Sequence, residues 1–556
     1  MKKNDGLKVL ERICVVGIVV LLAVIAIGVW MLYEMNSQDT EDQADITEPT
    51  AESAVEGQEG GESVDSLTQP SDFLPQNLQY GKKLPVTVFE TAEGSPVDLK
   101  KEYPGETLVL MYWGTWCPYC EKQLTHLAEF EELLKTKEAT RIVLINKTDP
   151  RKEESVEKAA AYLAENHFYQ DCLYDVDLKA YQAYGVKRIP TTIVVDPDGY
   201  VRAMEASVID SAEKLDALLD YAQQGSAASL LAFLNNSMRN EEGGVYTNCL
   251  KGAGGHPSGH DVLSESMGLL MEYAVTAGDR ELFDSAYSFV KNYMQKDGLV
   301  AWYVTENGEK AGANAFLDDL RIAGALQKAQ TRWGGYEEYA QLAANIQKRN
   351  LYRKQIASFY DFNVKEAGRS ISLCYADFST MDKLAEAVGD LSEYSEALRT
   401  IVENGYIGDA FPLYYSSWDY QKNRYSNSSI HTAEGLMTLY HLAEAGMLKE
   451  SSLEWLRERL LEDNLAARYE VDGSVPAGYA YDSTAVYAIA AMIGAEAGDA
   501  QIYMLAISKM ERSRVTDQNS PFYGGFSNDR SGKDITAFDQ LMPLLVYAQF
   551  GTVKFE

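Results

Sequence analysis

Two cysteines separated by two residues, Cys117 and Cys120, follow closely on the apolar run Thr107–Trp113. This run predicts a buried strand, and the cysteines then lie at the start of a helix that we expect to reach about Lys135. The unpaired N–H groups and the positive dipole end of the first helical turn favour a thiolate at Cys117. A Cys-x-x-Cys pair at a strand-to-helix junction therefore predicts thiol-disulfide chemistry.

Zinc binding is the main alternative for this cysteine pair. No second Cys pair or His pair lies nearby at ligand spacing, and Pro118 stiffens the turn that holds the two sulfurs together. We therefore expect redox chemistry with no metal and no other cofactor. His256 and His260 flank a Gly-rich loop further along the chain, where histidines are more often unligated than bound to a metal.

Apolar runs around the cysteine pair predict an α/β domain of βαβ order that ends in a hairpin. The proline of Ile189-Pro190, just before the last of these strands, can adopt the cis form and face the dithiol. The expected strands and helix are Leu84–Phe89, Thr107–Trp113, Arg141–Asn146, Glu154–Asn166 (helix) and Thr191–Val195, the last followed by the turn 196–199.

The amino-terminal region predicts a membrane anchor. Residues 13–33 form an uninterrupted apolar segment, long enough to cross a bilayer core of about 30 Å. Basic residues precede it and acidic residues follow it, so the 1–12 tail is expected to be cytoplasmic and the folded domains extracytoplasmic. A cleaved signal peptide, with a small-residue site at Ala26-Ile27-Gly28, is the alternative.

The charge of the chain limits its partners. A formal net charge of −33 argues against nucleic acid, because phosphate recognition needs clustered Lys and Arg. Residues 34–72 contain no Lys or Arg and are rich in acids, Ser, Thr, Gln and Gly, which predicts a disordered stalk. With 556 residues, the chain is too long for a single core. We expect folded domains at 73–224 and 225–556.

The cysteine pair, the preceding strand and Ile189-Pro190 together resemble the thioredoxin superfamily, in particular its membrane-tethered thiol-disulfide oxidoreductases. The resemblance covers residues 73–224. It implies Cys117 as the attacking thiolate, Cys120 as the resolving thiol, and Trp116 with Ile189-Pro190 as the edge that binds a partner protein's thiols or disulfides.

Two positions depart from this family. Met111 stands where thioredoxins carry a buried Asp, and Gln123 stands where the tethered branch carries a Glu. These changes predict slower exchange or the use of a different nearby acid. A third cysteine, Cys172, is interpreted as a core residue.

Beyond residue 225 the chain is a succession of helical stretches of two kinds. Some are apolar nearly all round and others are amphipathic, which predicts an inner ring enclosed by an outer ring, an α/α toroid. Acids recur about 48 to 58 residues apart at the expected starts of the inner helices, which suits six helical hairpins. These acids are Glu265, Asp319, Asp377, Glu434, Asp482 and Asp539. Acids near helix starts also complement the helix dipole, which is the alternative explanation for the regular spacing of these acids.

The segments Leu263–Gly268, Leu299–Trp302 and Asp318–Ala323 resemble glycoside hydrolase family 8, inverting enzymes acting on β-1,4-linked glycans and built as an (α/α)6 barrel. The resemblance implies Glu265 as the general acid and Asp319 as a sugar contact. It leaves two candidates for the base, Glu434 by helix order and Asp482 by local sequence.

An inverting hydrolase needs one protonated carboxyl and one carboxylate that holds water. Sugar rings also need flat apolar platforms, for which Trp302 and Trp418 are the leading candidates; Trp333, Tyr414, Tyr415 and Tyr481 are others. We expect a polysaccharide partner that is either cleaved or only held by the toroid. Cys249 and Cys374 are candidate substrates of the dithiol within the chain itself.

Overall fold

The computed structural model describes residues 80–168, 170–253, 257–389, 391–481, 483–529 and 531–555. The predicted anchor at 13–33 and stalk at 34–72, together with Asp482 and His256, lie outside these residues. Among the helices that are described, none combines the length and the apolar character needed to cross a bilayer.

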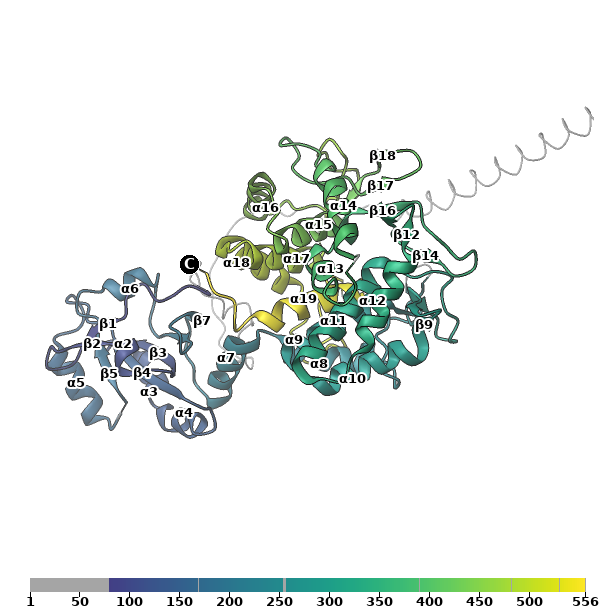
Figure 1. Cartoon of the computed structure of the whole chain (residues 1–556). Coiled ribbons are helices and arrows are strands. Elements are labelled where there is room, and N and C mark those ends of the chain that lie inside the picture. Colours follow the sequence, from purple (N-terminus) through teal and green to yellow (C-terminus); the bar gives the residue numbers. More distant parts are fainter. Residues whose placement is uncertain are drawn as a thin grey trace, which may run out of the picture. The chain divides into compact units, whose positions relative to one another are not determined.

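A seven-stranded sheet forms the first part of the described chain (Figure 1). Its strand order is β2-β1-β5-β4-β3-β6-β7. Strands β3, β4 and β5 run parallel, whereas β1 pairs antiparallel with β5, and β6 with both β3 and β7. The strands are β1 Val88–Glu90, β2 Pro96–Asp98, β3 Thr107–Trp113, β4 Thr140–Asn146, β5 Cys172–Tyr174, β6 Thr191–Val195 and β7 Val201–Glu205.

Helices follow the strands in the βαβ order that the sequence predicts. Strands β3 and β6 match their expected bounds, because central strands buried on both faces read as continuous apolar runs. The helix expected through Lys135 is instead two helices, separated at Thr125 and His126. The helices are α2 Leu99–Glu102, α3 Pro118–Leu124, α4 Leu127–Leu134, α5 Val156–Glu165, α6 Lys179–Ala183 and α7 Ala212–Gln224.

The rest of the described chain forms a closed toroid of helices (Figure 1). Six helices make the inner ring, each packs on the next in chain order, and the last packs back on the first. Nearly every residue of helix α17 is buried, in agreement with its all-round apolar sequence. The inner helices are α9 Ser264–Ala277, α11 Phe316–Trp333, α13 Phe378–Leu384, α15 Thr432–Glu444, α17 Thr484–Glu496 and α19 Ala537–Gln549.

Amphipathic helices surround the inner ring and bury their apolar stripe against it. Helix α8 packs on α19, so the first outer helix pairs with the last inner helix and closes the circle. The outer helices are α8 Ala227–Phe233, α10 Arg280–Phe289, α12 Glu338–Arg349, α14 Leu391–Asn404, α16 Glu450–Glu462 and α18 Ala500–Met510. Short turns η3 Leu234–Met238, η4 Val290–Met294, η5 Leu373–Tyr375 and η6 Glu511–Ser513 extend or join them.

Short strands connect the helices of the toroid. Most pair in two-stranded sheets, and β16, β17 and β18 form a three-stranded sheet. They are β8 Val262–Leu263, β9 Gln295–Lys296, β10 Leu299–Val300, β11 Tyr303–Val304, β12 Leu351–Tyr352, β13 Gln355–Ile356, β14 Tyr360–Asp361, β15 Glu366–Ala367, β16 Ser370–Ser372, β17 Ser417–Asp419, β18 Arg424–Tyr425, β19 Ile430–His431 and β20 Arg468–Tyr469.

The carboxyl-terminal residues return to the start of the described chain. The backbone N–H of Phe555 donates to the carbonyl oxygen of Gly81 at 2.8 Å, and the Arg202 guanidinium donates to the carbonyl oxygen of Val553 at 2.6 Å. The ring of Tyr80 packs on Phe550 with centroids 4.7 Å apart. Because sheet and toroid share these contacts, the experiments below use the full chain.

Candidate functional sites

The cysteine pair lies where the sequence predicts, between β3 and α3. Cys117 is the N-cap of α3, and its sulfur accepts a hydrogen bond from the backbone N–H of Cys120 at 3.2 Å. The two residues are joined as a disulfide with Cα atoms 5.3 Å apart. Cys117 is 5% exposed and Cys120 only 1%, so the Cys117 residue is the more accessible of the two. This asymmetry suits an attacking and a resolving thiol.

The peptide bond between Ile189 and Pro190 is cis, and it faces the dithiol as the sequence analysis expects. The Cys117 sulfur lies 3.6 Å from the carbonyl oxygen of Ile189. A Cβ added to Gly114 would lie 2.9 Å from the indole nitrogen of Trp116 and 3.3 Å from Cδ1 of Ile189, so these two side chains converge beside the cysteines. Trp116, Ile189 and Pro190 therefore form one edge around the Cys117 sulfur.

Gln123 does not replace the missing acid near the dithiol. Its side chain is buried, accepts a hydrogen bond from the backbone N–H of Ile209 at 2.9 Å, and donates to the Thr192 hydroxyl at 3.4 Å. A neutral amide engaged in this way ties α3 to β6. It has no exchangeable carboxyl proton for the resolving thiol.

A different acid, Glu153, lies against the loop that leads to Cys117. Its carboxylate accepts hydrogen bonds from the Thr115 backbone N–H at 3.0 Å, the Thr115 hydroxyl at 2.5 Å and the Asn146 amide at 3.3 Å. Glu153 is only 4% exposed although it lies in a strongly charged stretch of sequence. Sequence reasoning missed this residue because its neighbours look like an ordinary solvated loop.

The third cysteine of this part of the chain is not poised for exchange. Burial raises the pKa of the Cys172 thiol to about 12. At neutral pH this thiol stays protonated and is a poor nucleophile. The position agrees with the core role that the sequence analysis assigns to it.

In the toroid, the first turns of α9, α11 and α15 bring three carboxyl groups within electrostatic reach of one another. Burial raises the pKa of Glu265 to about 7, with further contributions from Asp318 and Glu434 and an opposing one from Arg321. Glu265 is partly exposed and Glu434 is exposed. The two candidates for acid and base thus face the same end of the toroid.

Asp318 is the buried partner of Glu265. The Ser264 hydroxyl donates to the Asp318 carboxylate at 2.6 Å, and the Arg321 guanidinium lies 3.9 Å from it. Burial raises the pKa of Asp318, while Arg321 and Ser264 oppose the increase. The hydroxyl donor and the nearby cation favour the charged form of Asp318, so this geometry favours a proton on Glu265.

The structure places Asp319 where it does not fit the expected sugar contact. Its side chain is 0% exposed, and its two oxygens accept hydrogen bonds from the Val300 backbone N–H at 3.1 Å and the Asn314 amide at 2.8 Å. These bonds tie the start of α11 to the segment before it. The neighbouring Asp318, which the sequence analysis did not single out, is the residue that interacts with Glu265.

The other regularly spaced acids form hydrogen bonds at the starts of helices. Asp377 caps α13 by accepting from the backbone N–H of Thr380 at 2.9 Å. Asp539, near the start of α19, accepts from the backbone N–H of Ala485 in α17 at 3.0 Å. The alternative reading, in which acids complement helix starts, therefore accounts for these two. Asp482, the reserve candidate for the base, is outside the described residues.

The expected aromatic platforms divide into two groups. Trp302 is half-buried, and its backbone carbonyl accepts from the backbone N–H of Ser264 at 3.0 Å, which places it beside Glu265. Trp418 in β17 is half-buried and packs on Tyr425. In contrast, Tyr414 is buried, and Trp333 packs on Phe283 at the far end of α11. The last two serve the core.

Turn η5 adds two residues to the surroundings of the acids. Burial raises the pKa of Tyr375, and Asp318, Glu265 and Glu434 add to the increase, so its hydroxyl faces the carboxyl cluster. Cys374 is buried, and burial with the charges of Glu434 and Glu265 raises the pKa of its thiol. The expectation that Cys374 is available to the dithiol is therefore wrong.

Within the described part of the chain, no group of three or more His, Cys, Asp or Glu side chains is arranged to hold a metal ion. His260 stacks on Tyr246 with ring centroids 4.0 Å apart.

Comparison with known proteins gives two family matches. Residues 79–219 match Redoxin, and residues 257–371 match Glycosyl hydrolases family 8. The thiol-disulfide oxidoreductase ResA of Bacillus thuringiensis is 30% identical over 127 residues, which cover 23% of this chain and 69% of the relative.

Similarity to the toroid comes from a relative and a solved structure. The putative lipoprotein YdaJ of Bacillus subtilis is 28% identical over 294 residues, 51% of this chain and 78% of the relative. A solved structure of an alpha-amylase from Clostridium perfringens is 29% identical with a TM-score of 0.55, and the match covers 58% of this chain and 97% of that structure.

Proposed function

Because the chain belongs to the redoxin family through residues 79–219 and to glycosyl hydrolase family 8 through residues 257–371, we propose that it couples thiol-disulfide exchange with cleavage of a polysaccharide. The exchange involves Cys117 and Cys120, and the cleavage involves Glu265 and Glu434. Each half has its own supporting geometry and its own test.

The proposed exchange starts from the reduced pair. The Cys117 thiolate attacks a partner disulfide, the partner's S–S bond breaks, and the released thiolate takes up a proton. Cys120 then attacks the Cys117 sulfur of the mixed disulfide, which frees the second partner thiol. The partner gains two electrons and two protons, and the Cys117–Cys120 pair is oxidised. The observation that carries this proposal is the Cys117 sulfur at the start of α3, joined to Cys120 and 3.6 Å from the carbonyl oxygen of Ile189.

Reduction of insulin disulfides by the full chain tests this half. The Cys117→Ser variant loses the activity, because no other described cysteine caps a helix beside a second cysteine. The matched control is Cys172→Ser, which removes a half-buried thiol of high pKa and keeps the activity. Equal activity in Cys117→Ser and the parent would refute the proposal.

The proposed hydrolysis inverts the sugar carbon. Glu265 donates its proton to the leaving oxygen, the glycosidic C–O bond breaks, and a water held by Glu434 adds from the opposite face and gives its proton to Glu434. Inverting enzymes need the two carboxyls roughly 6.5–9.5 Å apart. The observation that carries this proposal is the convergence of Glu265, Asp318 and Glu434 at the first turns of α9, α11 and α15; burial raises the pKa of Glu265 to about 7, which suits a general acid at neutral pH.

Release of reducing ends by the full chain tests this half. We expect activity on a β-1,4-glucan, and Glu265→Gln should lower it by about 10²–10⁴-fold without changing the melting temperature by more than a few degrees. The control Glu454→Gln removes an exposed acid on outer helix α16 and leaves activity unchanged. Full activity in Glu265→Gln would refute the assignment.

An α-1,4-glucan is the second candidate substrate, because a solved relative of the toroid is an alpha-amylase. The same assay on soluble starch separates the two linkages. A toroid that only binds glycan is the remaining alternative, and it predicts retention of glycan with no reducing ends from either substrate.

Attachment to the outer face of a membrane is part of the proposal. It rests on the apolar segment 13–33 and its flanking charges, and the name of the relative YdaJ, a putative lipoprotein, is consistent with it. Protease added to intact cells should degrade both folded parts. Protection of both parts until the membrane is opened would contradict the proposed orientation.

A further inference from the structure

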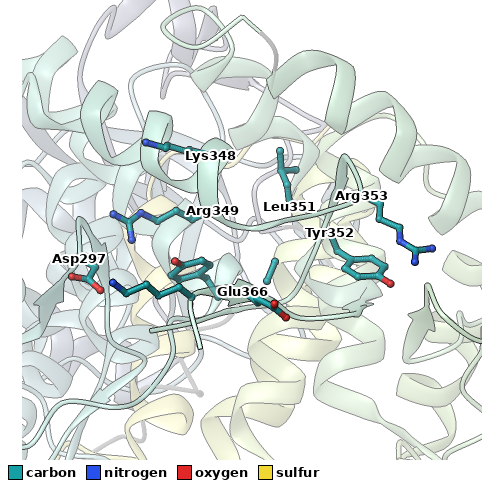
Figure 2. A pocket seen from close by; sticks show the side chains of 10 residues that line it. Asp297, Lys348, Arg349, Leu351, Tyr352, Arg353 and Glu366 are labelled. Atoms are coloured by element: carbon teal, nitrogen blue, oxygen red, sulfur yellow. The ribbon is translucent and has the colours of Figure 1, made fainter. Parts of the chain in front are cut away.

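We propose that a basic pocket beside helix α12 binds the acid groups of an anionic polysaccharide. This proposal rests on the proposed glycan function and narrows its substrate class. The pocket has a volume of about 600 Å³ and is formed by the end of α12 and the hairpins β12–β13 and β14–β15 (Figure 2).

Four cations line the basic pocket, although the chain as a whole has 83 acidic and only 50 basic residues. Lys348 and Arg349 end α12, Arg353 lies in the turn of the first hairpin, and Lys365 lies in the turn of the second. Lys348, Arg353 and Lys365 are exposed. Among the described residues none of the four forms an ion pair, so their charges are available to a ligand.

The two acids of the basic pocket do not neutralise these cations. Glu366 lies 3.9 Å from Arg369, which does not line the pocket. Asp297 occupies the turn between β9 and β10, with a φ of 52°, and Figure 2 shows it at one edge of the pocket. With four cations against two acids, the pocket attracts anions.

Aromatic rings accompany the cations. The Arg353 guanidinium lies 5.1 Å from the centroid of the Tyr352 ring, and the Arg349 guanidinium lies 5.5 Å from that of Tyr360. The Nε of Arg349 is buried without a hydrogen-bond partner among the described residues. Flat rings next to cations suit a pyranose ring that carries a carboxylate or phosphate, because the ring stacks while the acid group pairs.

The basic pocket is hydrogen-bonded to the loop that precedes helix α11. The backbone N–H of Asn314 donates to the carbonyl oxygen of Tyr360 at 3.2 Å, and Ala313 forms a β-bridge with Asp361. Helix α11 follows directly and presents Asp318 in its first turn. Tyr360 of the pocket wall is therefore bonded to the loop before α11, the helix that carries Asp318 beside Glu265.

A polyanion of another class, single-stranded nucleic acid, also has rings and phosphates. The family of the toroid favours a glycan, and the net charge of −33 disfavours a long nucleic acid. Nucleic acid therefore enters the test as a competing outcome.

The test measures binding by calorimetry with the full-length Glu265→Gln protein, so that cleavage does not interfere. The probes are oligogalacturonate as a carboxylated glycan, a glycerol-phosphate polymer as a phosphate-bearing one, a neutral cello-oligosaccharide of similar length, and single-stranded DNA as the competing polyanion. We expect tighter binding of at least one acidic probe than of the neutral probe, and weaker binding of it as salt rises from 50 to 300 mM. The acidic probe that binds identifies the acid group.

The triple variant Lys348→Glu, Arg353→Glu, Lys365→Glu should weaken that binding by about tenfold, since each exposed ion pair contributes about 1.4- to 5-fold. Lys533→Glu, an exposed lysine outside the pocket, should not change it. Equal binding of acidic and neutral probes, no effect of salt, or tighter binding of single-stranded DNA would overturn the proposal. The binding assay does not require cleavage. Its result can therefore be interpreted even if the toroid proves not to be a hydrolase.

Discussion

Replacing Asp318 by Asn tests how the toroid sets the protonation of Glu265. Asp318 is the largest charged contribution to the raised pKa of Glu265, after burial itself. In the parent, with a pKa of about 7, about half of Glu265 is protonated at pH 7. With the ordinary pKa of 4.5, Glu265 would be protonated in only about one molecule in 300 at pH 7.

The Asn variant removes a negative charge but keeps the burial. The pKa of Glu265 should therefore fall only part of the way. A fall of about one pH unit would leave about one tenth of Glu265 protonated at pH 7, a fivefold loss of the competent acid. The alkaline limb of the rate profile should move to lower pH, because a general acid is lost when it ionises.

Difference infrared titration of the Glu265 carboxyl, against Glu265→Gln, measures this pKa directly and does not require hydrolysis. The pH profile of reducing-end release provides the second measurement. The control Glu454→Gln should leave both unchanged. An unchanged or higher pKa of Glu265 in Asp318→Asn would refute the account of the carboxyl pair.

Three further predictions concern the supports of the two sites. Glu153→Gln should lower the free energy of unfolding by about 1–3 kcal/mol in urea titrations and slow dithiol exchange, because an amide cannot accept all the hydrogen bonds that the carboxylate accepts. The control Glu154→Gln, at the exposed neighbouring residue, should change neither the free energy of unfolding nor the exchange rate. Asp377→Ala should cost about 1 kcal/mol through loss of the α13 cap, seen as a lower melting temperature. Asp539→Ala should cost about 1–3 kcal/mol because it leaves the Ala485 N–H unpaired. Unaltered unfolding in any of these variants would show that its hydrogen bonds do not contribute as described.

The extent of prediction from sequence differs between the two parts of the fold. Strand β3 and the cis Ile189-Pro190 bond could be predicted, because a buried central strand is apolar throughout and a proline before a strand is a recognisable signal. The inner helices could be predicted for the same reason, as α17 illustrates. The short strands β5 and β2 could not, since three residues do not establish an alternating pattern.

Site residues were harder to predict than elements. Asp318 and Asp319 are adjacent, and one residue along a helix turns the side chain by about 100°, so the one faces Glu265 and the other the interior. The family resemblance selects Asp319, whereas the residue that interacts with Glu265 is Asp318. Glu153 escaped notice because its partner Thr115 is 38 positions away in sequence, a contact that only the folded chain reveals.

Trapping of a mixed disulfide by the Cys120→Ser full-length protein tests the central claim most directly. With the resolving thiol removed, a partner disulfide should remain covalently attached at Cys117, and peptide mass mapping should locate the adduct there and nowhere else. An adduct at Cys172, Cys249 or Cys374 instead, or none at all, would contradict the proposal that Cys117 is the attacking thiol.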